Sequence, residues 1–410
     1  MRDLSKRDYS ILIANTIDHF DTALYGFLAP IFAANFFPNS DPLISLILAY
    51  SVFATTIVTR PVGSYVFGTI ALSYGPVIGL SYSLIGVAIT TAVLGLLPTY
   101  EHIGVGAPLL LIILRSLSGI CSSGEMTIAK LFILSDRNNF ESNKNSYLYQ
   151  TSSMVGIVLA SFASTIILKL PMEQPYWRLC FVIGGLCALF GYKLRSIEQD
   201  MTNSSSFDKK HLSYIHIPIF TSFHTLWKNK IVLFRIAVVS GFSYITYSIP
   251  FIVMNNLIPN FTGFSLEHMM TSNTILLVLD MLLLPIVGHF LLKSGAKNTL
   301  LCCAILLLIP SLPMLYFTKN ASFAYLIAVK LWIIIIGIAF CCKINLWCND
   351  LIKGKEKYLI VGISGSIGSA SVGKMAPAIC LTLYYYIPSP MVIGVFMMMI
   401  AGATIWALWK

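Results

Sequence analysis

The sequence predicts an all-α integral membrane protein, with twelve transmembrane helices arranged in two six-helix, pseudo-symmetric bundles. Composition, a series of long apolar runs and an internal repeat support this fold. Of the 410 residues, 57% are hydrophobic and 11% are charged, whereas a soluble domain carries about 25% charged residues. Because so few charged residues cannot cover a water-exposed surface, we expect most of the protein surface to face the lipid bilayer.

Six apolar runs, each long enough to cross a bilayer at about 20 residues, occupy the first half. Breaks at Pro, Asn, Gly and charged clusters separate them. The first run contains Asp18, His19 and Asp21 and lacks a convincing cleavage site. We therefore interpret it as a retained helix rather than a signal peptide. The six runs lie near residues 10–36, 43–68, 76–97, 106–134, 146–168 and 176–194.

The longest polar interval, residues 195–230, divides the chain near its middle. Its Ser, Asn and Lys content is typical of a solvated linker rather than a binding module. We expect an N-terminal bundle over 1–194, a cytoplasmic linker over 195–230 and a C-terminal bundle over 231–410. The six runs of the second half lie near residues 231–256, 271–292, 297–317, 322–343, 357–383 and 389–409.

An internal repeat relates the two halves at an offset of 220 residues. It relates Pro30 to Pro250 and also the glycines that close the second and eighth runs. A duplicated six-helix unit explains both coincidences. The glycines that bound the two repeated loops are Gly68 and Gly75 in the first half and Gly288 and Gly295 in the second.

Lys and Arg residues cluster at the N-terminus and in the intervals after the fourth, sixth, eighth and tenth runs. Segments 37–42, 98–105, 257–270 and 384–388 contain none, and the two other intervals on that side contribute only Lys169 and Lys319. The net charge of +10 therefore reflects membrane topology rather than nucleic-acid binding. We expect a multi-pass protein of the cell inner membrane with both termini cytoplasmic.

The first run contains Asn15, Asp18, Asp21 and Tyr25 in a largely apolar sequence. Their spacing places the last three on roughly one helical face. That face must avoid lipid, because a carboxylate in mid-membrane costs about 2.5–3.5 kcal/mol. Two interpretations remain open. These carboxylates bind and release protons, or they form a structural ion pair.

The fourth run carries a polar stripe of Arg115, Ser118 and Ser122. Glu125 lies about 15 Å farther along the helix axis, so we expect Arg115 and Glu125 to find partners on other helices. Arg115 either binds an anionic substrate or neutralises an Asp of the first run.

Two small residues of the fourth run, Gly119 and Ser123, allow a close helix approach. We expect them to bring the first and fourth runs together. Lys130 follows at the end of the fourth run.

Three charged residues, Asp280, Lys330 and Lys374, fall near the centres of runs in the second half. We expect Asp280 to pair with Lys330 or Lys374, with direct substrate contact as the alternative. The glycine- and serine-rich segment 362–369 favours tight helix packing or a flexible cavity-lining helix. A phosphate loop is disfavoured because the GK[ST] ending is missing.

The nine cysteines lie almost entirely inside apolar runs and form no CxxC pair. We therefore expect no disulfide and no metal site. No HExxH or GxSxG motif is present, so we expect neither an enzyme nor a cofactor.

Several motifs resemble the metabolite:proton symporter branch of the major facilitator superfamily, which contains proline/betaine, citrate, shikimate and ketoglutarate carriers. The resemblance implies the major facilitator fold and gives Asp18, Asp21, Arg115 and Glu125 candidate roles in proton coupling and substrate binding. The motifs are Asn15 to Asp21, Tyr25-Gly26-Phe27, Arg60-Pro61-Val62-Gly63, Phe67-Gly68, Arg115 with Gly119, Gly124 and Glu125, and Trp177-Arg178.

The sequence departs from this family at several positions, including Ser73 and Pro76 in the first loop, where cations are usual. Leu72 and Leu292 stand where the repeated gating loops of the superfamily normally carry Asp. The resemblance therefore implies an altered cytoplasmic gate. His19 stands where the family usually has a bulky aromatic residue, which changes either the proton affinity or the shape of the cavity.

The expected function is secondary active transport, as proton-coupled symport of a small organic acid, amino acid or zwitterionic osmolyte by alternating access. The alternatives are a uniporter or exchanger of the same fold, a non-transporting membrane sensor, or a membrane-embedded enzyme. The expected partners are the solute, protons and the lipid bilayer, and we expect a monomer. Asp18, Asp21 and Glu125 are the proton-coupling candidates, and the substrate-binding candidates are Asn15, Tyr25, Arg115, Ser122 and Lys130.

Overall fold

The computed structural model describes residues 6–129, 139–170, 175–189, 226–319, 321–352 and 357–409. Within these ranges every regular element is a helix. The predicted linker lies outside the described residues up to position 225, and Lys130 also lies outside them.

The helices of the first half follow the predicted runs. Proline divides the first run into α1 (Lys6–Phe27) and α2 (Ala29–Phe36), and the second run comprises α3 (Pro42–Ser51), a short 3-10 turn and α4 (Thr56–Tyr74). The others are α5 (Pro76–Leu96), the short α6 (Tyr100–Ile103), α7 (Gly106–Gly124) with its π-helical continuation η2 (Glu125–Ala129), α9 (Asn139–Lys169), and the helix Trp177–Leu189.

The second half begins with α12 (Lys230–Ser248), which continues through the π-helical η4 (Ile249–Val253) into α13 (Met254–Leu257). In the described part of the chain, eight helical segments are long and apolar enough to cross a membrane. The later helices are α14 (Leu266–Phe290), α15 (Ala296–Leu308), α16 (Ser311–Tyr316), α17 (Phe323–Leu351), α18 (Lys357–Gly368), the π-helical η6 (Ser369–Lys374), α19 (Ala376–Tyr386) and α20 (Met391–Trp409).

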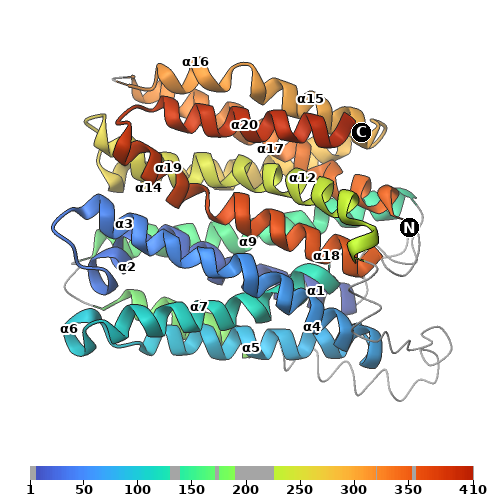
Figure 1. The fold of residues 1–410 in the computed structure, drawn as a ribbon, viewed down its shortest axis with the longest axis horizontal. Helices are drawn as coiled ribbons and strands as arrows, with labels where there is room; N and C mark the ends of the chain where they lie inside the picture. Colours follow the sequence, from blue (N-terminus) through green and yellow to red (C-terminus); the bar gives the residue numbers. More distant parts are fainter. Residues whose placement is uncertain are drawn as a thin grey trace.

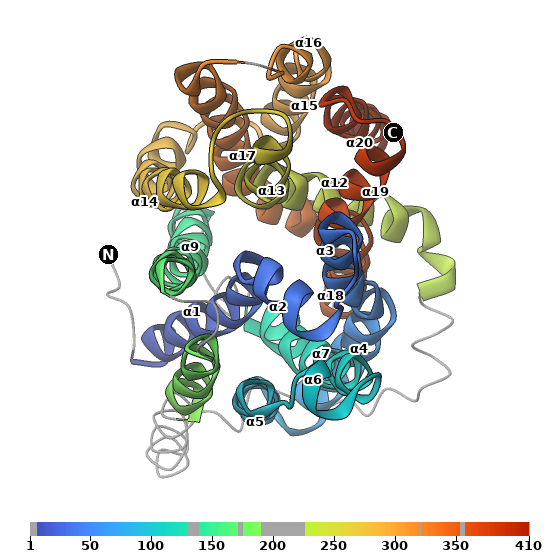
Figure 2. The same ribbon diagram turned by 90° about the vertical axis from the view of Figure 1, so that its left-hand side faces the viewer.

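The long helices run side by side, and both chain ends lie at the same end of the molecule (Figure 1). Figure 2, which looks along the helices, shows α1, α5 and α7 on one side and α15, α17 and α20 on the other. Two helix pairs, α9 with α14 and α4 with α18, connect the two groups. The helices of the two sequence halves therefore meet along an extended interface.

Small residues set the closest helix contacts, but with a different partner from the one predicted. A Cβ atom added at Gly63 of α4 would collide with Ile120 and Ser123 of α7, and one added at Gly119 would lie 2.8 Å from Thr59 of α4. The small residues of α7 thus bring it against α4. The prediction that they approach the first span was wrong, because α1 instead packs against α9, where Gly156 meets Thr16.

Proline interrupts the first span of each half at equivalent positions. Pro30 lies in the first turn of α2, and Pro250 lies in the first turn of η4. Because proline has no N–H, the carbonyl four residues earlier loses its helical partner. For Pro30 this carbonyl belongs to Gly26, and it accepts a hydrogen bond from the Tyr50 hydroxyl at 2.9 Å.

The two repeated loops differ in backbone conformation. Gly75 joins α4 to α5 with a φ of 101°, which favours glycine, whereas Gly295 precedes α15 with a φ of −66°. Gly68 lies within α4, and Gly288 lies within α14. The other two residues of the predicted gating loops are Leu292, in the turn after α14, and Leu72, which is in α4 but has a side chain outside the described set.

Candidate functional site

A central cavity lies between the two halves. Residues of α1, α9 and the α3–α4 segment form its wall from the first half, and α12, α17 and the α18–α19 segment form its wall from the second half. Its polar and ionisable lining residues are His19, Thr22, Tyr149, Gln150, Ser153, Ser240, Ser243, Tyr244, Tyr247, Ser248, Cys341, Asn345 and Lys374.

Lys374 supplies the ammonium group of this lining, and local packing brings it there. It ends the π-helical η6, a rare geometry that is frequent at functional sites. Gly368, just before η6, and Gly373, within it, pack directly against Ala237 and Tyr244 of α12. In the glycine- and serine-rich segment 362–369, Gly368 thus shows the predicted tight packing, and Gly365 lines the cavity. The Lys374 Nζ atom lies 5.4 Å from the centre of the Phe53 ring.

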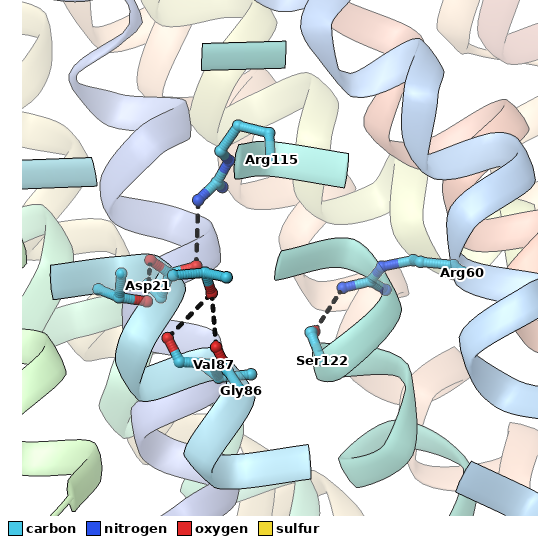
Figure 3. A network of polar contacts seen from close by, with 8 residues as sticks. Asp21, Arg60, Gly86, Val87, Arg115 and Ser122 are labelled. Atoms are coloured by element: carbon cyan, nitrogen blue, oxygen red, sulfur yellow. Dashed lines mark hydrogen bonds and ion pairs between the residues drawn. The ribbon is translucent and has the colours of Figure 1, made fainter. Parts of the chain in front are cut away.

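A second group of polar residues lies behind His19 and Tyr244. The Arg60 guanidinium donates to Ser122 Oγ at 3.0 Å (Figure 3) and also to the Tyr244 hydroxyl. Asp18 is buried, and its Oδ1 has no hydrogen-bond partner among the described residues. Its charge acts on His19 and Tyr244. Arg60, from α4, thus links the interior of the first half to a cavity residue of the second.

Asp21 and Arg115 form a buried ion pair, with Oδ2 and Nη1 3.1 Å apart (Figure 3). Thr91 donates a second hydrogen bond to Asp21 Oδ1 at 2.9 Å. The Arg115 guanidinium also lies 4.4 Å from the centre of the Tyr25 ring. Of the two roles considered for Arg115, this geometry matches neutralisation of an Asp from the first span.

Asn15 and Tyr25 bind to neighbouring helices. The Asn15 amide donates to the Tyr149 carbonyl, Ser152 and Ser153 of α9. The Tyr25 side chain is fully buried, and its hydroxyl donates to the Ala49 carbonyl at 2.8 Å.

The predicted substrate-binding residues Asn15, Tyr25, Arg115 and Ser122 are therefore not brought together at the described cavity wall. They stabilise the interior of the first half. Glu125 is fully buried at the start of η2 and likewise does not line the described cavity.

The expected pairing of the buried charges in the second half is not seen. The Lys330 ammonium donates instead to Asn255 Oδ1, and Lys374 faces Phe53. Asp280 forms no ion pair with a described residue, and its buried Oδ1 lacks a hydrogen-bond partner there. The pairing prediction was wrong because depth in the membrane does not determine which way a side chain points around its helix.

Sequence reasoning missed the cavity roles of Tyr244, Tyr247 and Gln150. Only His19 carried a signal, because it departs from the family pattern at a position next to Asp18. A polar residue on α9 or α12 is no sign of a cavity by itself, since serine and threonine also pack between membrane helices.

Comparison with known proteins identifies the family. The sequence model of the Major Facilitator Superfamily matches residues 11–373. The chain is 25% identical to the alpha-ketoglutarate permease of Escherichia coli, over 93% of this chain and 88% of the permease. It is also 25% identical to the citrate-proton symporter of Klebsiella pneumoniae, over 91% of this chain and 84% of the symporter.

Relatives named for zwitterions match one part of the chain. The glycine betaine/proline/ectoine/pipecolic acid transporter OusA of Dickeya dadantii is 31% identical over 47% of this chain and 39% of its own length.

The fold resembles solved transporters at low sequence identity. The proton:xylose symporter XylE has a TM-score of 0.73 at 12% identity, over 98% of this chain and 94% of XylE. The human organic anion transporter MFSD10 has a TM-score of 0.65 at 14% identity, over 99% of this chain and all of that one. These matches confirm the predicted fold and the resemblance to metabolite symporters. The chain belongs to the Major Facilitator Superfamily, and it is a membrane transporter rather than an enzyme.

Proposed function

We propose that this secondary active transporter carries a small polar metabolite together with protons by alternating access. The observation that carries the proposal is the central cavity, whose polar wall is shared between the two sequence halves. A site shared by two bundles changes its access when the bundles rock against each other. The bundles of this proposal are residues 1–194 and 231–410, joined by the linker 195–230.

Several polar contacts between the halves are single hydrogen bonds. Ser64 of α4 and Ser366 of α18 lie 2.6 Å apart, and Ser161 of α9 lies 2.8 Å from Thr274 of α14. A typical hydrogen bond contributes only about 0.5–1.5 kcal/mol net to stability. Breaking a few of these bonds to open one side therefore costs little, and the apolar packing that also joins the halves makes up the rest of the cost.

Buried carboxyl groups beside the cavity support proton coupling. Asp18, Asp21 and Glu125 are each 4% exposed or less, so their carboxyl groups lie in the protein interior rather than in solvent. Protonation of Asp21 would release Arg115 from its ion pair, and protonation of Asp18 would remove a charge that acts on the cavity residue His19. Either event changes the electrostatic balance at the interface, which couples a proton to the orientation of the bundles. Two of the relatives and structural neighbours are named as proton symporters.

Uptake into proteoliposomes tests this function. Labelled 2-oxoglutarate, citrate, proline and glycine betaine are offered with and without an inward pH gradient. We expect the gradient to drive accumulation of at least one solute, and Asp21→Asn and Glu125→Gln to abolish accumulation while leaving some counterflow. Accumulation that is unchanged without the gradient, or in both variants, would refute proton coupling and leave a uniporter or exchanger.

Glu267→Gln provides the matched control. Its carboxylate is exposed and lies 3.7 Å from exposed Lys169, far from the cavity lining. Removing this charge changes the number of carboxylates equally but leaves the proposed pathway intact. Accumulation by Glu267→Gln should match that of the unmodified protein.

The setting of the transporter is part of the proposal. We place it in the cell inner membrane as a monomer with both termini cytoplasmic. The support comes from the clustered Lys and Arg residues of alternate loops and from the common location of the two chain ends (Figure 1).

A further inference from the structure

The described lining of the central cavity contains a lysine but no aspartate or glutamate. Its other titratable side chains are His19, three tyrosines and Cys341. A solute in this cavity therefore meets hydroxyl, amide and imidazole groups and one ammonium group, without a carboxylate to receive a cationic group. The described lining can therefore offer a positive charge to a solute but no carboxylate.

Lys374 differs from Arg115 and Lys330 in having no acceptor among the described residues. Arg115 is held by Asp21 at 3.1 Å, and Lys330 donates to Asn255. Lys374 forms neither a hydrogen bond nor an ion pair with any residue in the described part of the chain, and it is directed at the Phe53 ring. An aromatic face attracts a cation but leaves the three N–H donors of an ammonium group unsatisfied.

Charged groups of both signs act on Lys374. The arginines are Arg60 and Arg115, and the carboxylates are Asp18 and Asp21. Because charge is expensive inside a membrane, an anion entering the cavity would pair with the Lys374 ammonium, whereas a zwitterion would bring an ammonium group of its own.

We propose that the central cavity binds the carboxylate of a small organic anion, with Lys374 as its charged partner. This proposal rests on the transport function proposed above and narrows its substrate class. The ammonium group donates to the carboxylate, and Tyr244, whose hydroxyl is already oriented by Arg60, lies next to Lys374 in the wall. Since Lys374 comes from the second half and Arg60 and Phe53 from the first, a bound anion lies between groups of both bundles.

Uptake by the whole protein in proteoliposomes tests the proposal. The probes are labelled lactate, 2-oxoglutarate and citrate as net anions, and proline and glycine betaine as zwitterions. We expect uptake of at least one anion and little uptake of either zwitterion. Lys374→Gln should raise the KM for the anion at least about tenfold, since hydrogen bonds to charged groups are strong, while Lys374→Arg should restore most of the affinity.

Two controls separate binding from folding. Lys297→Gln removes an exposed lysine of α15 and should leave the KM unchanged. Size-exclusion chromatography of each purified variant shows whether it remains monodisperse, and recovery of affinity in Lys374→Arg distinguishes loss of charge from loss of structure.

The outcomes are distinct. Uptake of proline or glycine betaine that is unaffected by Lys374→Gln, or anion uptake with an unchanged KM in that variant, overturns the anion site while transport itself stands. An absence of both uptake and counterflow for all five probes in the unmodified protein overturns the transport function and the anion site together.

Discussion

Individual buried charges in this transporter differ in how completely they are satisfied. Asp21 has an arginine and a threonine as partners, whereas Asp280 has an oxygen without any partner among the described residues. A buried ion pair is weak evidence for stability, but removing one member leaves an uncompensated charge. The two aspartates should therefore respond differently to substitution.

Arg115→Gln should destabilise the protein by about 3–5 kcal/mol, because it leaves the Asp21 carboxylate buried without a counter-charge. Thermal unfolding of the purified protein in detergent measures the change. The double variant Asp21→Asn with Arg115→Gln should recover much of the loss, since it leaves no isolated charge.

The stability of Asp280→Asn provides the comparison with Arg115→Gln. It replaces a carboxyl group that has no cationic partner in the described part of the chain, so the melting temperature should not fall. A large loss of stability in Asp280→Asn, or an unchanged melting temperature in Arg115→Gln, would contradict this account of the buried charges.

At the scale of helices, small residues determine which neighbours come closest. The contact between α1 and α9 depends on Gly156, where an added Cβ would collide with the Thr16 carbonyl and lie 3.0 Å from the Phe20 nitrogen. These neighbours are backbone atoms of a helix, so they cannot move aside as a flexible side chain can.

Gly156→Ala should therefore cost about 1–3 kcal/mol through overpacking, although alanine is the better helix former. Gly402→Ala in α20 is the matched control, because its nearest neighbour is a leucine methyl group 3.9 Å away. Thermal unfolding should show a lower melting temperature for the first variant alone. Equal stability of the two variants would show that α1 and α9 have room to separate.

The helices were predictable from the sequence, and their contacts were not. Hydropathy locates spans because each must satisfy its backbone internally in lipid. Spacing along one helix also shows that Gly119 and Ser123 share a face, but it does not say whether α1 or α4 packs there. The same limit explains why Asp280 was assigned a lysine partner and why the choice between pairing and substrate contact stayed open for Lys374. Both depend on rotation about the helix axis relative to helices distant in sequence.

At the scale of the whole molecule, charge distribution and the location of the chain ends agree. Most loops on one predicted side are rich in Lys and Arg, whereas the loops on the other side contain only Lys169 and Lys319. The N- and C-termini lie at the same end of the helices (Figure 1). An even number of crossings, combined with the preference of cations for the cytoplasm, determines the expected orientation.

Reporter fusions test this orientation. Green fluorescent protein at the C-terminus should fluoresce, and alkaline phosphatase at the same position should be inactive. Phosphatase inserted in the cation-free segment 37–42 should be active. The reverse pattern of phosphatase activity would contradict the cytoplasmic location of the termini.

A proline interrupts the helical first span of each half. At Pro30 the missing N–H has already removed one backbone hydrogen bond, and the Tyr50 hydroxyl has taken its place at the Gly26 carbonyl. Asn256, from the second half, donates to that same hydroxyl at 2.9 Å. The outer segment α2 stays joined to α1 through Leu28, which donates to the Leu24 carbonyl and accepts from Ile31 and Phe32. Since Asn256 follows Pro250 in the second half, one tyrosine hydroxyl connects the proline breaks of both halves, and displacement of either outer segment would strain that shared contact.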